Sequence, residues 1–401
     1  MHAPLTRTKH RVLVLDSIAK SGITILEKSG HSVLKNEENP TAILVRSTKV
    51  FPGEHPDLVA IARAGAGTDN IDVAQATARG IPAFYAPGQN ANSVYELVFI
   101  VLGMYARKVP DSIAFRHKTN FTVMDASTFK GVMAAEKRKR VGFELLGKTL
   151  GVIGLGHIGR LVANGGIRRG MRVIGYDPAL KELDPERFDV GIELAQNMTQ
   201  VLRGANVISL HVPVVNDKAL IGAEQIDQML RETILINYAR GELVDEDALL
   251  DGLDSGKVRA YLTDFPSLRT VSHPKVQWTE HLGASTEESE ERCAVMAARQ
   301  LDNYLKYGIV ENAVNFPNVG ALPRMGIKMR LAIPHRNVPG QLALIMDVLA
   351  KAGANVGPQQ NDTKGEIGYC VVDLEEPIND EQISTIKNGH ENIIGVRVFR
   401  F

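Results

Sequence analysis

The sequence has 401 residues, enough for roughly two to three domains of about 150 residues each. Apolar residues make up 44% of it, as is typical of globular proteins with buried cores. The 46 basic and 46 acidic side chains balance to a formal net charge of zero, which argues against a protein that coats nucleic acid or binds a membrane surface.

The first ten residues, Met1 to His10, form a segment that is polar and basic in overall character. The apolar run that follows, residues 12–15, is too short for a signal peptide. No segment of the sequence approaches the ~20 apolar residues of a membrane span. The two cysteines, Cys293 and Cys370, cannot build a disulfide framework and lack a metal-binding spacing. We therefore expect a cytoplasmic protein with no metal site.

Short apolar runs alternate with helix-like stretches over the first three quarters of the chain, which predicts βαβ units and parallel sheets. A first series of strands is expected at residues 12–15, 42–45, 58–62 and 81–85. A helix is expected over 18–28 and a longer one over 92–107, where apolar residues recur at helical spacing. A second series of strands is expected at 149–153, 172–176, 207–210, 234–237, 259–263 and 276–279. This second series predicts a complete doubly wound domain.

The last quarter begins with a long helix over 287–307, which we expect to return to the first domain and make it discontinuous. A linker is indicated at 315–320 by its glycine, proline and asparagine content. Beyond it, strands at 327–333, 367–374 and 393–399 and a helix over 339–353 are expected. Asn379 and Gln382 resemble a capping box that opens a second helix. The order β-α-β-β-α-β predicts a ferredoxin-like domain.

A glycine-rich turn lies between the strand at 149–153 and a helix, in the sequence Gly154-Leu155-Gly156-His157-Ile158-Gly159. In this context the three glycines are typical of a dinucleotide site. Asp177, 18 positions after Gly159, ends the next strand, where a carboxylate accepts hydrogen bonds from the adenosine ribose and disfavours NADP. We therefore expect NAD as cofactor. The alternative is a structural turn and a surface carboxylate, and Gly165 and Gly166 within the expected helix have no explanation from the sequence.

Polar side chains follow four strands of the second series, where open α/β sheets bind their ligands. These candidates are His211-Val212-Pro213, Tyr238-Ala239-Arg240-Gly241, Asp264 and Glu280-His281.

At these motifs the chain resembles the D-isomer-specific 2-hydroxyacid dehydrogenase family, over almost its whole length. The resemblance rests on residues 65–72, 90–96, 237–241 and 281–286 and on the glycine turn. Within the family it is closest to the phosphoglycerate dehydrogenases. It implies a discontinuous substrate-binding domain (1–96 and 287–320), a Rossmann-type NAD-binding domain (97–286) and a regulatory domain (326–401).

The resemblance also implies roles for individual residues. His281 would take the proton of the substrate hydroxyl while hydride passes to NAD, and Arg240 would bind the carboxylate and C2 oxygen. Asp264 would bind the nicotinamide end of the cofactor, and Ala66 and Gly67 would bind the substrate carboxylate. Further residues expected to line the cofactor are His157, Ile158, His211, Val212, Pro213, Ala239, Gly283 and Ala284. The alternatives are that His281 is a surface or packed histidine, Arg240 a salt-bridge partner and His211 a structural residue.

One departure from the family concerns the partner of the catalytic histidine. The family carries a glutamate a few residues after Asp264, but here Phe265-Pro266-Ser267-Leu268-Arg269 follows. Glu280 stands where the family has a proline before the histidine. Such a carboxylate normally fixes the tautomer of a histidine. Our hypothesis is that another carboxylate or a water orients His281.

The substrate is suggested by Arg46-Ser47-Thr48-Lys49 after the strand at 42–45, because cations and hydroxyls suit a phosphate. Arg46 and Ser47 match an Arg-Ser pair of phosphoglycerate dehydrogenases. The resemblance thus implies oxidation of 3-phospho-D-glycerate to 3-phosphohydroxypyruvate, the first step of L-serine biosynthesis. Two alternatives stay open, an unphosphorylated D-2-hydroxy acid as substrate and a catalytically impaired sensor. The basic run 137–140 is interpreted mainly as a solvated connection, although one member could reach an active site in a partner subunit.

The C-terminal domain resembles the ACT domain, an amino-acid-sensing module. His335, Asn337 and Asn355 match residues that bind L-serine across a domain pair in serine-regulated dehydrogenases, and asparagines suit a zwitterion because they donate and accept hydrogen bonds. The resemblance implies feedback inhibition by L-serine and a homotetramer. The alternative is an ACT domain that only dimerises.

Overall fold

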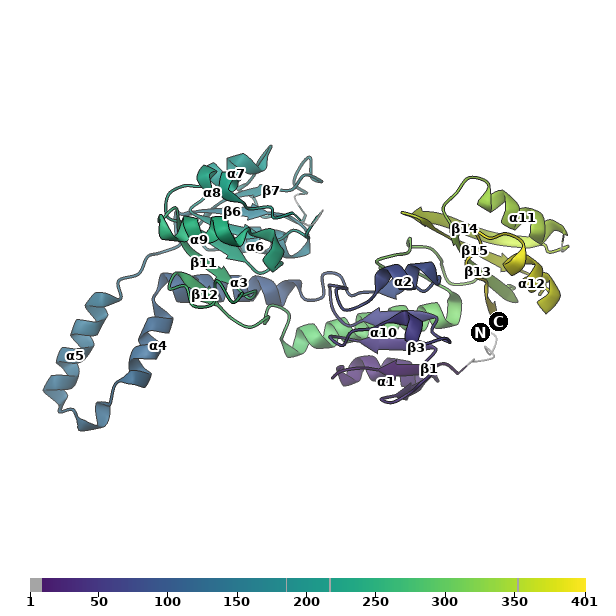
Figure 1. The fold of residues 1–401 in the computed structure, drawn as a ribbon, viewed down its shortest axis with the longest axis horizontal. Coiled ribbons are helices and arrows are strands. Elements are labelled where there is room, and N and C mark those ends of the chain that lie inside the picture. Colours follow the sequence, from purple (N-terminus) through teal and green to yellow (C-terminus); the bar gives the residue numbers. More distant parts are fainter. Residues whose placement is uncertain (1–8, 185, 216–217, 352) are drawn as a thin grey trace. The chain divides into compact units, whose positions relative to one another are not determined.

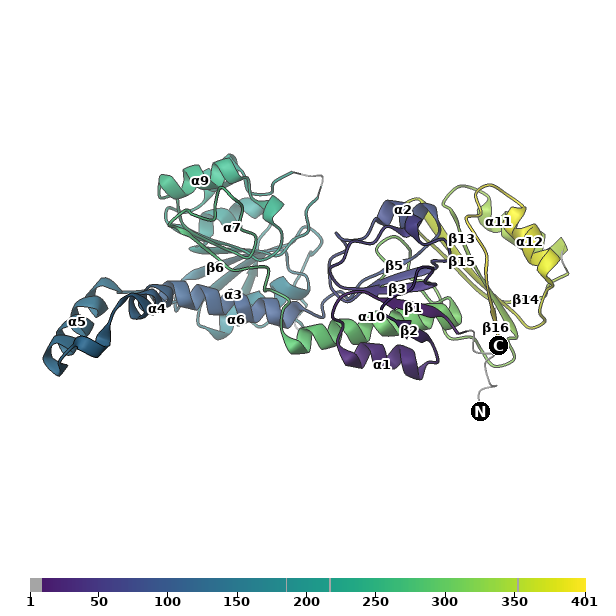
Figure 2. The same ribbon diagram turned by 60° about the horizontal axis from the view of Figure 1, so that its bottom comes forward.

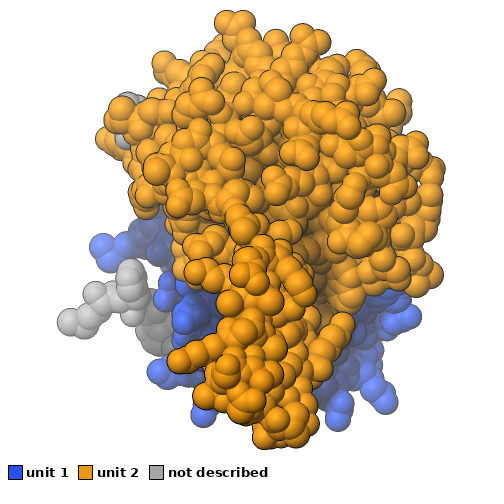
Figure 3. All heavy atoms as spheres, turned by 90° about the vertical axis from the view of Figure 1, so that its left-hand side faces the viewer, with its two compact units in different colours: residues 1–90, 286–401 blue, residues 91–285 orange. Residues whose placement is uncertain are grey.

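The computed structural model describes residues 9–184, 186–215, 218–351 and 353–401. They form two compact units (Figure 3): unit 1 comprises residues up to Asn90 and from Thr286 onward, and unit 2 comprises Ala91–Ser285. Residues 1–8, on which the expectation of no signal peptide partly rests, lie outside the described part. Among the described helices, none combines the length and apolar character that a bilayer span requires.

Unit 1 begins with a five-stranded parallel sheet in the order β2-β1-β3-β4-β5 (Figure 1). Its strands are β1 (Arg11–Val14), β2 (Ser32–Leu34), β3 (Ala42–Val45), β4 (Ala60–Arg63) and β5 (Ala83–Phe84). Its helices are α1 (Lys20–Lys28), α2 (Val73–Ala78) and α10 (Glu287–Tyr307), with the short η1 (Pro52–Glu54). Strand β3 is buried throughout, as expected for a parallel strand covered on both faces. Helices α1 and α10 lie side by side (Figure 2), so a late segment of the chain completes the first sheet.

Unit 2 contains a seven-stranded sheet, parallel throughout, in the order β12-β11-β10-β9-β6-β7-β8. The strands are β6 (Thr149–Ile153), β7 (Arg172–Tyr176), β8 (Ile192–Leu194), β9 (Val207–Leu210), β10 (Thr233–Asn237), β11 (Val258–Thr263) and β12 (Val276–Trp278). The helices around them are α3 (Ala91–Ala106), α6 (His157–Arg168), α7 (Met198–Gly204), α8 (Ala223–Gln228) and α9 (Glu246–Asp254), with η3 (Gly241–Leu243). The strand order reverses between β6 and β9, which is where such sheets bind ligands.

Two helices project from unit 2 as an arm (Figures 1 and 2): α4 (Val109–Lys118) and α5 (Ala126–Lys139), joined through η2 (Phe121–Val123). No residue of these three elements is buried. Residues 137–139 are solvated as expected, but they form the last turn of α5 rather than a connection, and Arg140 follows the helix. Cations stabilise the C-terminal end of a helix, which carries partial negative charge.

The C-terminal part of unit 1 is a four-stranded antiparallel sheet in the order β14-β15-β13-β16, the ferredoxin-like topology. Its strands are β13 (Met329–Arg336), β14 (Val356–Lys364), β15 (Ile367–Leu374) and β16 (Arg397–Arg400), and its helices are α11 (Gln341–Lys351) and α12 (Asp380–Asn388). The capping box is confirmed, since Asn379 and Gln382 each accept a hydrogen bond from the other's backbone N–H. The last strand starts later than expected because Ile393 forms only an isolated bridge with His335.

Candidate active site

The glycine turn follows β6 at the point where the strand order reverses. Gly154 has a φ of +89°, and a Cβ there would lie 2.4 Å from the carbonyl oxygen of His211, so only glycine fits. Gly156, in contrast, is exposed, with open space where its Cβ would be. Helix α6 begins at the next residue, His157, so unpaired N–H groups of its first turn lie beside that space. The turn therefore offers the backbone approach and the helix N-terminus that a pyrophosphate requires.

Asp177 follows β7 and is hydrogen-bonded to the glycine turn. One carboxylate oxygen accepts from the backbone N–H of Leu155 at 2.9 Å and the other from that of Ala179 at 2.9 Å. Each oxygen keeps a second acceptor position. The carboxylate is thus fixed beside the turn and can still accept from ribose hydroxyls.

His211 follows β9 and lies directly behind the turn. Its Nε2 is 2.8 Å from the hydroxyl of Ser209, and burial lowers its pKa to about 3. The imidazole is therefore neutral at neutral pH. The backbone and Cβ of His211 limit the space at Gly154 and Gly159, so in this structure His211 helps to shape the glycine turn. The neighbouring Val212 side chain borders Gly154, and Pro213 is exposed.

The two glycines within α6, unexplained by the sequence, are explained by packing. A Cβ on Gly165 would lie 2.4 Å from the ring of Tyr95 on α3, and a Cβ on Gly166 would lie 2.8 Å from both Leu150 and Val173. The glycines therefore allow α6 to approach α3 on one side and the sheet on the other. This close packing offsets a helix-propensity cost of about 1 kcal/mol per glycine.

Arg240, Asp264 and His281 follow three neighbouring strands, β10, β11 and β12, at the same edge of the sheet. Buried Asn237 fixes the turn that carries Arg240: its amide oxygen accepts from the Arg240 N–H at 3.3 Å and its amide nitrogen donates to the Arg240 carbonyl at 2.8 Å. The Arg240 guanidinium donates to the carbonyl of Ala239 at 2.8 Å and lies close enough to Asp264 to lower its pKa.

Asp264 is 2% exposed, and its Oδ2 accepts from the backbone N–H of Gly283 at 3.1 Å. Its Oδ1 is buried and has no hydrogen-bond partner within the described part of the chain. Burial raises the pKa of this carboxyl to about 6, against the opposing effects of the Gly283 N–H and Arg240. A buried acceptor without a partner is unfavourable. The amide group of nicotinamide would supply the missing donor, so the residues present fit this cofactor.

His281 is exposed at the end of this row, and its ring centroid lies 4.6 Å from that of Phe265. Phe265 is a site residue that the sequence reasoning missed, although its position directly after Asp264 could have indicated it. In the loop where the family's glutamate was expected, the hydroxyl of Ser267 lies 3.2 Å from that of Thr270. That another carboxylate or a water orients His281 stays a prediction.

The residues predicted to bind phosphate lie in unit 1, after β3. The backbone N–H groups of Arg46, Ser47 and Thr48 all donate to one carboxylate oxygen of Asp16, at 2.7–3.0 Å. Partial burial acts to raise the pKa of Asp16, but the hydroxyl and N–H of Thr48 and the other two N–H groups lower it to about 2. Asp16, a second residue missed from the sequence, therefore holds the loop rigidly. Ala66 and Gly67 follow β4 and are partly exposed.

The three residues predicted to bind serine are not brought together within one chain. His335 is 3% exposed, with Nδ1 2.9 Å from the Arg336 carbonyl and Nε2 3.0 Å from Oδ1 of Asn361. Asn337 follows β13 at the same end of the sheet, and Asn355 precedes β14 at the other end. The register separates these ends by about 25 Å.

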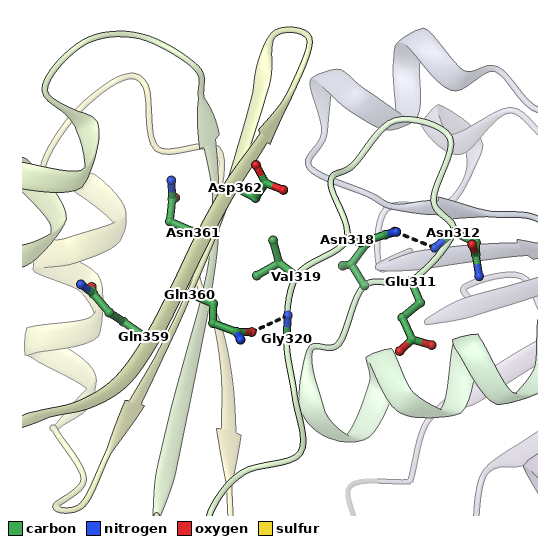
Figure 4. A pocket seen from close by; sticks show the side chains of 10 residues that line it. Glu311, Asn312, Asn318, Val319, Gly320, Gln359, Gln360, Asn361 and Asp362 are labelled. Carbon is green, nitrogen blue, oxygen red and sulfur yellow. Dashed lines mark hydrogen bonds between the residues drawn. The ribbon is translucent and has the colours of Figure 1, made fainter. Parts of the chain in front are cut away.

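A cavity of about 740 Å³ lies between β14 and residues 310–320 of unit 1 (Figure 4). It is lined mainly by polar side chains, and the Gln360 side chain accepts from the backbone N–H of Gly320 at 2.9 Å. None of the site residues predicted from the sequence lines this cavity.

The geometry is that of a nicotinamide-dependent dehydrogenase, and comparisons with known proteins agree. Residues 112–283 match the NAD-binding domain of the D-isomer specific 2-hydroxyacid dehydrogenases. The D-3-phosphoglycerate dehydrogenase of Escherichia coli is 34% identical over 344 residues, which are 82% of this chain and 79% of the relative. The chain belongs to the D-isomer specific 2-hydroxyacid dehydrogenase family and is an NAD-dependent oxidoreductase.

Further relatives carry the same name. The D-3-phosphoglycerate dehydrogenase of Haemophilus influenzae is 33% identical over 92% of this chain and 93% of the relative. That of Methanocaldococcus jannaschii is 36% identical over 77% of this chain, but the matched region spans only 60% of that longer relative. The crystal structure of NAD⁺-bound 3-phosphoglycerate dehydrogenase from Entamoeba histolytica is similar with a TM-score of 0.62 and 26% identity, over 77% of this chain and 99% of that one. The predictions of fold class, family and cofactor are thus confirmed.

Proposed function

We propose that the protein oxidises 3-phospho-D-glycerate to 3-phosphohydroxypyruvate with NAD, as the first step of L-serine biosynthesis. The observation that carries this proposal is the rigid loop at Arg46 and Ser47, whose guanidinium and hydroxyl suit a phosphate. The names of the relatives support the same substrate.

In this proposal NAD, held by the glycine turn, Asp177 and Asp264, would supply the acceptor for the hydride from C2 of the substrate. His281 takes the hydroxyl proton, Arg240 holds the carboxylate and C2 oxygen, and Asp264 orients the nicotinamide amide. Ala66 and Gly67 offer backbone N–H groups to the substrate carboxylate. The exposed position of His281 leaves its ring accessible to a substrate.

The test is an assay of NADH formation with 3-phospho-D-glycerate, D-glycerate and D-lactate as parallel substrates. A kcat/KM at least tenfold higher for the phosphorylated substrate is expected. A preference for D-lactate or D-glycerate would support the second candidate, a dehydrogenase for another D-2-hydroxy acid. No turnover of any of the three, with NAD still bound, would support an impaired sensor.

We further propose that residues 326–401 form an ACT domain at which L-serine inhibits the enzyme. Asn337 and Asn355 are exposed and supply donors and acceptors, but they lie at opposite ends of their sheet. A site that includes both therefore requires a second copy of the chain. Inhibition by millimolar L-serine, and not by D-serine, is the expected result of the same assay.

The assembly that such a site needs is proposed to be a homotetramer. The arm of α4, η2 and α5 exposes large apolar side chains, among them Ile113, Val123, Phe129 and Met133. Exposed apolar surface of this kind favours contact with another protein surface. Light scattering should give four times the mass of one chain. The variants Val123→Ser and Met133→Ser should give a lower mass, because they remove apolar surface from the arm. We also propose a cytoplasmic location, because Cys293 and Cys370 are buried and unpaired.

A further inference from the structure

Arg46, the residue assigned to the substrate phosphate, is already paired with a carboxylate of its own chain. Its Nη1 lies 2.7 Å from Oε1 of Glu290, in the first turn of α10. The two side chains are 28% and 38% exposed, so the pair lies at the surface where a ligand can reach it.

The backbone that carries Arg46 is fixed from two sides. Asp16 accepts from its N–H at 3.0 Å, and Nε of Arg63 donates to its carbonyl at 2.9 Å. Only the Arg46 side chain is therefore free to change partner. A carboxylate that is ion-paired with one guanidinium nitrogen leaves other N–H donors for a phosphate, which binds arginine through two parallel hydrogen bonds.

The surrounding charge explains why a carboxylate is tolerated here. Arg46, Arg63 and Arg292 all lower the pKa of the Cys293 thiol, whereas burial, the largest effect, raises it. The charges of three guanidinium groups thus act on one buried side chain. Glu290 offsets one of these charges in the ligand-free protein.

We propose that Glu290 is an internal competitor of the substrate phosphate for Arg46, and so sets the KM for phosphorylated substrates. The inference rests on the proposed phosphate site. Binding of the phosphate breaks the Arg46–Glu290 pair, so part of the binding free energy is used to separate it. Glu290 is a positioning residue, since it acts on the substrate only through Arg46.

This competition affects binding and leaves the chemical step unchanged. Glu290→Gln keeps the size of the side chain and removes its charge, so the KM for 3-phospho-D-glycerate should fall about two- to fivefold with kcat unchanged, as befits a partly exposed ion pair. The KM for D-glycerate, which has no phosphate, should not change. The difference between wild type and variant should shrink at high salt, which screens the pair.

The matched control is Glu291→Gln. Glu291 is the next residue on α10, is exposed, and forms no ion pair with any described residue. A second control uses the variant Arg46→Gln, which lacks the residue for which Glu290 and the phosphate compete. In this variant, the additional change Glu290→Gln should have no further effect on KM.

Calorimetric titration of inorganic phosphate into wild type, Glu290→Gln and Glu291→Gln separates this inference from the proposed function. If Glu290→Gln alone binds phosphate two- to fivefold more tightly, the competition is established even where 3-phospho-D-glycerate is not turned over. If phosphoglycerate is turned over but Glu290→Gln matches wild type in both KM and phosphate affinity, the inference is overturned and the function stands. Equal changes in Glu290→Gln and Glu291→Gln would also overturn it, because they would reflect net charge alone.

Discussion

Two of the sheets that carry predicted sites differ in how much of each site one chain supplies. In unit 2, β10, β11 and β12 are neighbours and parallel, so the residues that follow them meet at one edge. In the ferredoxin-like sheet, β13 and β14 are separated by β15, and Asn337 and Asn355 lie at opposite ends. Consecutive parallel strands gather side chains from distant parts of one chain, whereas an antiparallel sheet spreads its loops over two ends, so a site that contained both asparagines would need a second chain.

The two regions also differ in polar groups left without partners. Asp264 keeps a buried oxygen without a donor, while both ring nitrogens of His335 already have hydrogen-bond partners in the same chain. The polar groups at the edge of the unit 2 sheet thus leave an acceptor for a ligand, whereas those around His335 are hydrogen-bonded within the chain. The following predictions test this contrast in order of decreasing effect.

The largest effect is expected at His281, because the proposed mechanism has no other general base. His281→Ala should lower kcat with 3-phospho-D-glycerate by about 10²–10⁴-fold. Calorimetry should give the same dissociation constant for NAD as in wild type, since the glycine turn and Asp177 are unchanged. A variant that retains more than a tenth of wild-type turnover would remove His281 from the mechanism.

The internal bonds of the ferredoxin-like sheet are tested at Arg330. Its side chain, 3% exposed, pairs with Asp373 at 2.5 and 2.9 Å and donates to the carbonyls of Tyr307, at the end of α10, and Ala321. Arg330→Met leaves Asp373 buried and unpaired, and should lower the free energy of unfolding by about 3–5 kcal/mol in urea titrations.

The control for this prediction is the double variant Arg330→Met/Asp373→Leu. It removes both charges, so much of the lost stability should return. If the double variant were as unstable as the single one, the backbone carbonyls of Tyr307 and Ala321, rather than the unpaired carboxylate, would account for the loss.

The unpartnered carboxyl of Asp264 should make stability depend on pH. Its folded pKa of about 6 exceeds the unfolded value of 3.8, so the native state binds the proton more tightly. The stabilisation is fully present below pH 3.8 and is lost as pH rises through about 6. Asp264→Asn removes this dependence and should stabilise the apoprotein by roughly 1–3 kcal/mol at pH 7.5, with little effect near pH 4.

The same variant should bind NAD more weakly and turn over slowly, because the amide cannot hold the cofactor as the carboxylate does. Thermal unfolding at pH 4.5, 6 and 7.5 measures the stability difference, and Asp177→Asn, on the other side of the cofactor site, is the comparison. A stability difference between wild type and Asp264→Asn that does not change with pH would contradict the raised pKa.

The sequence predicted the parallel sheets well, because buried strands such as β6 and β9 are short, mostly apolar segments followed by glycine or polar residues. It did not locate β14, a polar edge strand whose first three residues are partly exposed and whose last six are exposed, so no apolar alternation marks it. It also did not predict α5, since a helix that buries none of its residues has no apolar stripe.

The site was predictable where a residue follows a strand end or a glycine turn, as for Arg240, Asp264 and Gly154. It was not predictable where the role depends on a contact between distant segments. Asp16 binds a loop 30 residues away, and Glu290 pairs with a residue from the other end of the chain. Neither spacing nor composition encodes such contacts, because they depend on how β3 and α10 pack.

The smallest effects concern serine, and they test the claim that its site needs two chains. Asn337→Ala and Asn355→Ala should each raise the concentration of L-serine for half-inhibition by roughly 10-fold, the loss of one to two hydrogen bonds to a charged ligand. Uninhibited activity should be unchanged, since both residues lie in the ferredoxin-like domain and neither is among the residues proposed to bind substrate or cofactor. Lys351→Ala, an exposed change on α11, serves as the control.

Mixing the two variants distinguishes a shared site from one within a single chain. In a shared site, Asn337 of one chain meets Asn355 of the other. A pair made of one Asn337→Ala chain and one Asn355→Ala chain then contains one site with both substitutions and one site with neither. Co-refolded or co-expressed Asn337→Ala and Asn355→Ala chains should therefore regain about a quarter of wild-type serine sites, visible as a sensitive fraction in the inhibition curve. If the site lay within one chain, every site in the mixture would carry one substitution and no sensitive fraction would appear. The register of β13 and β14 makes the first result the expected one.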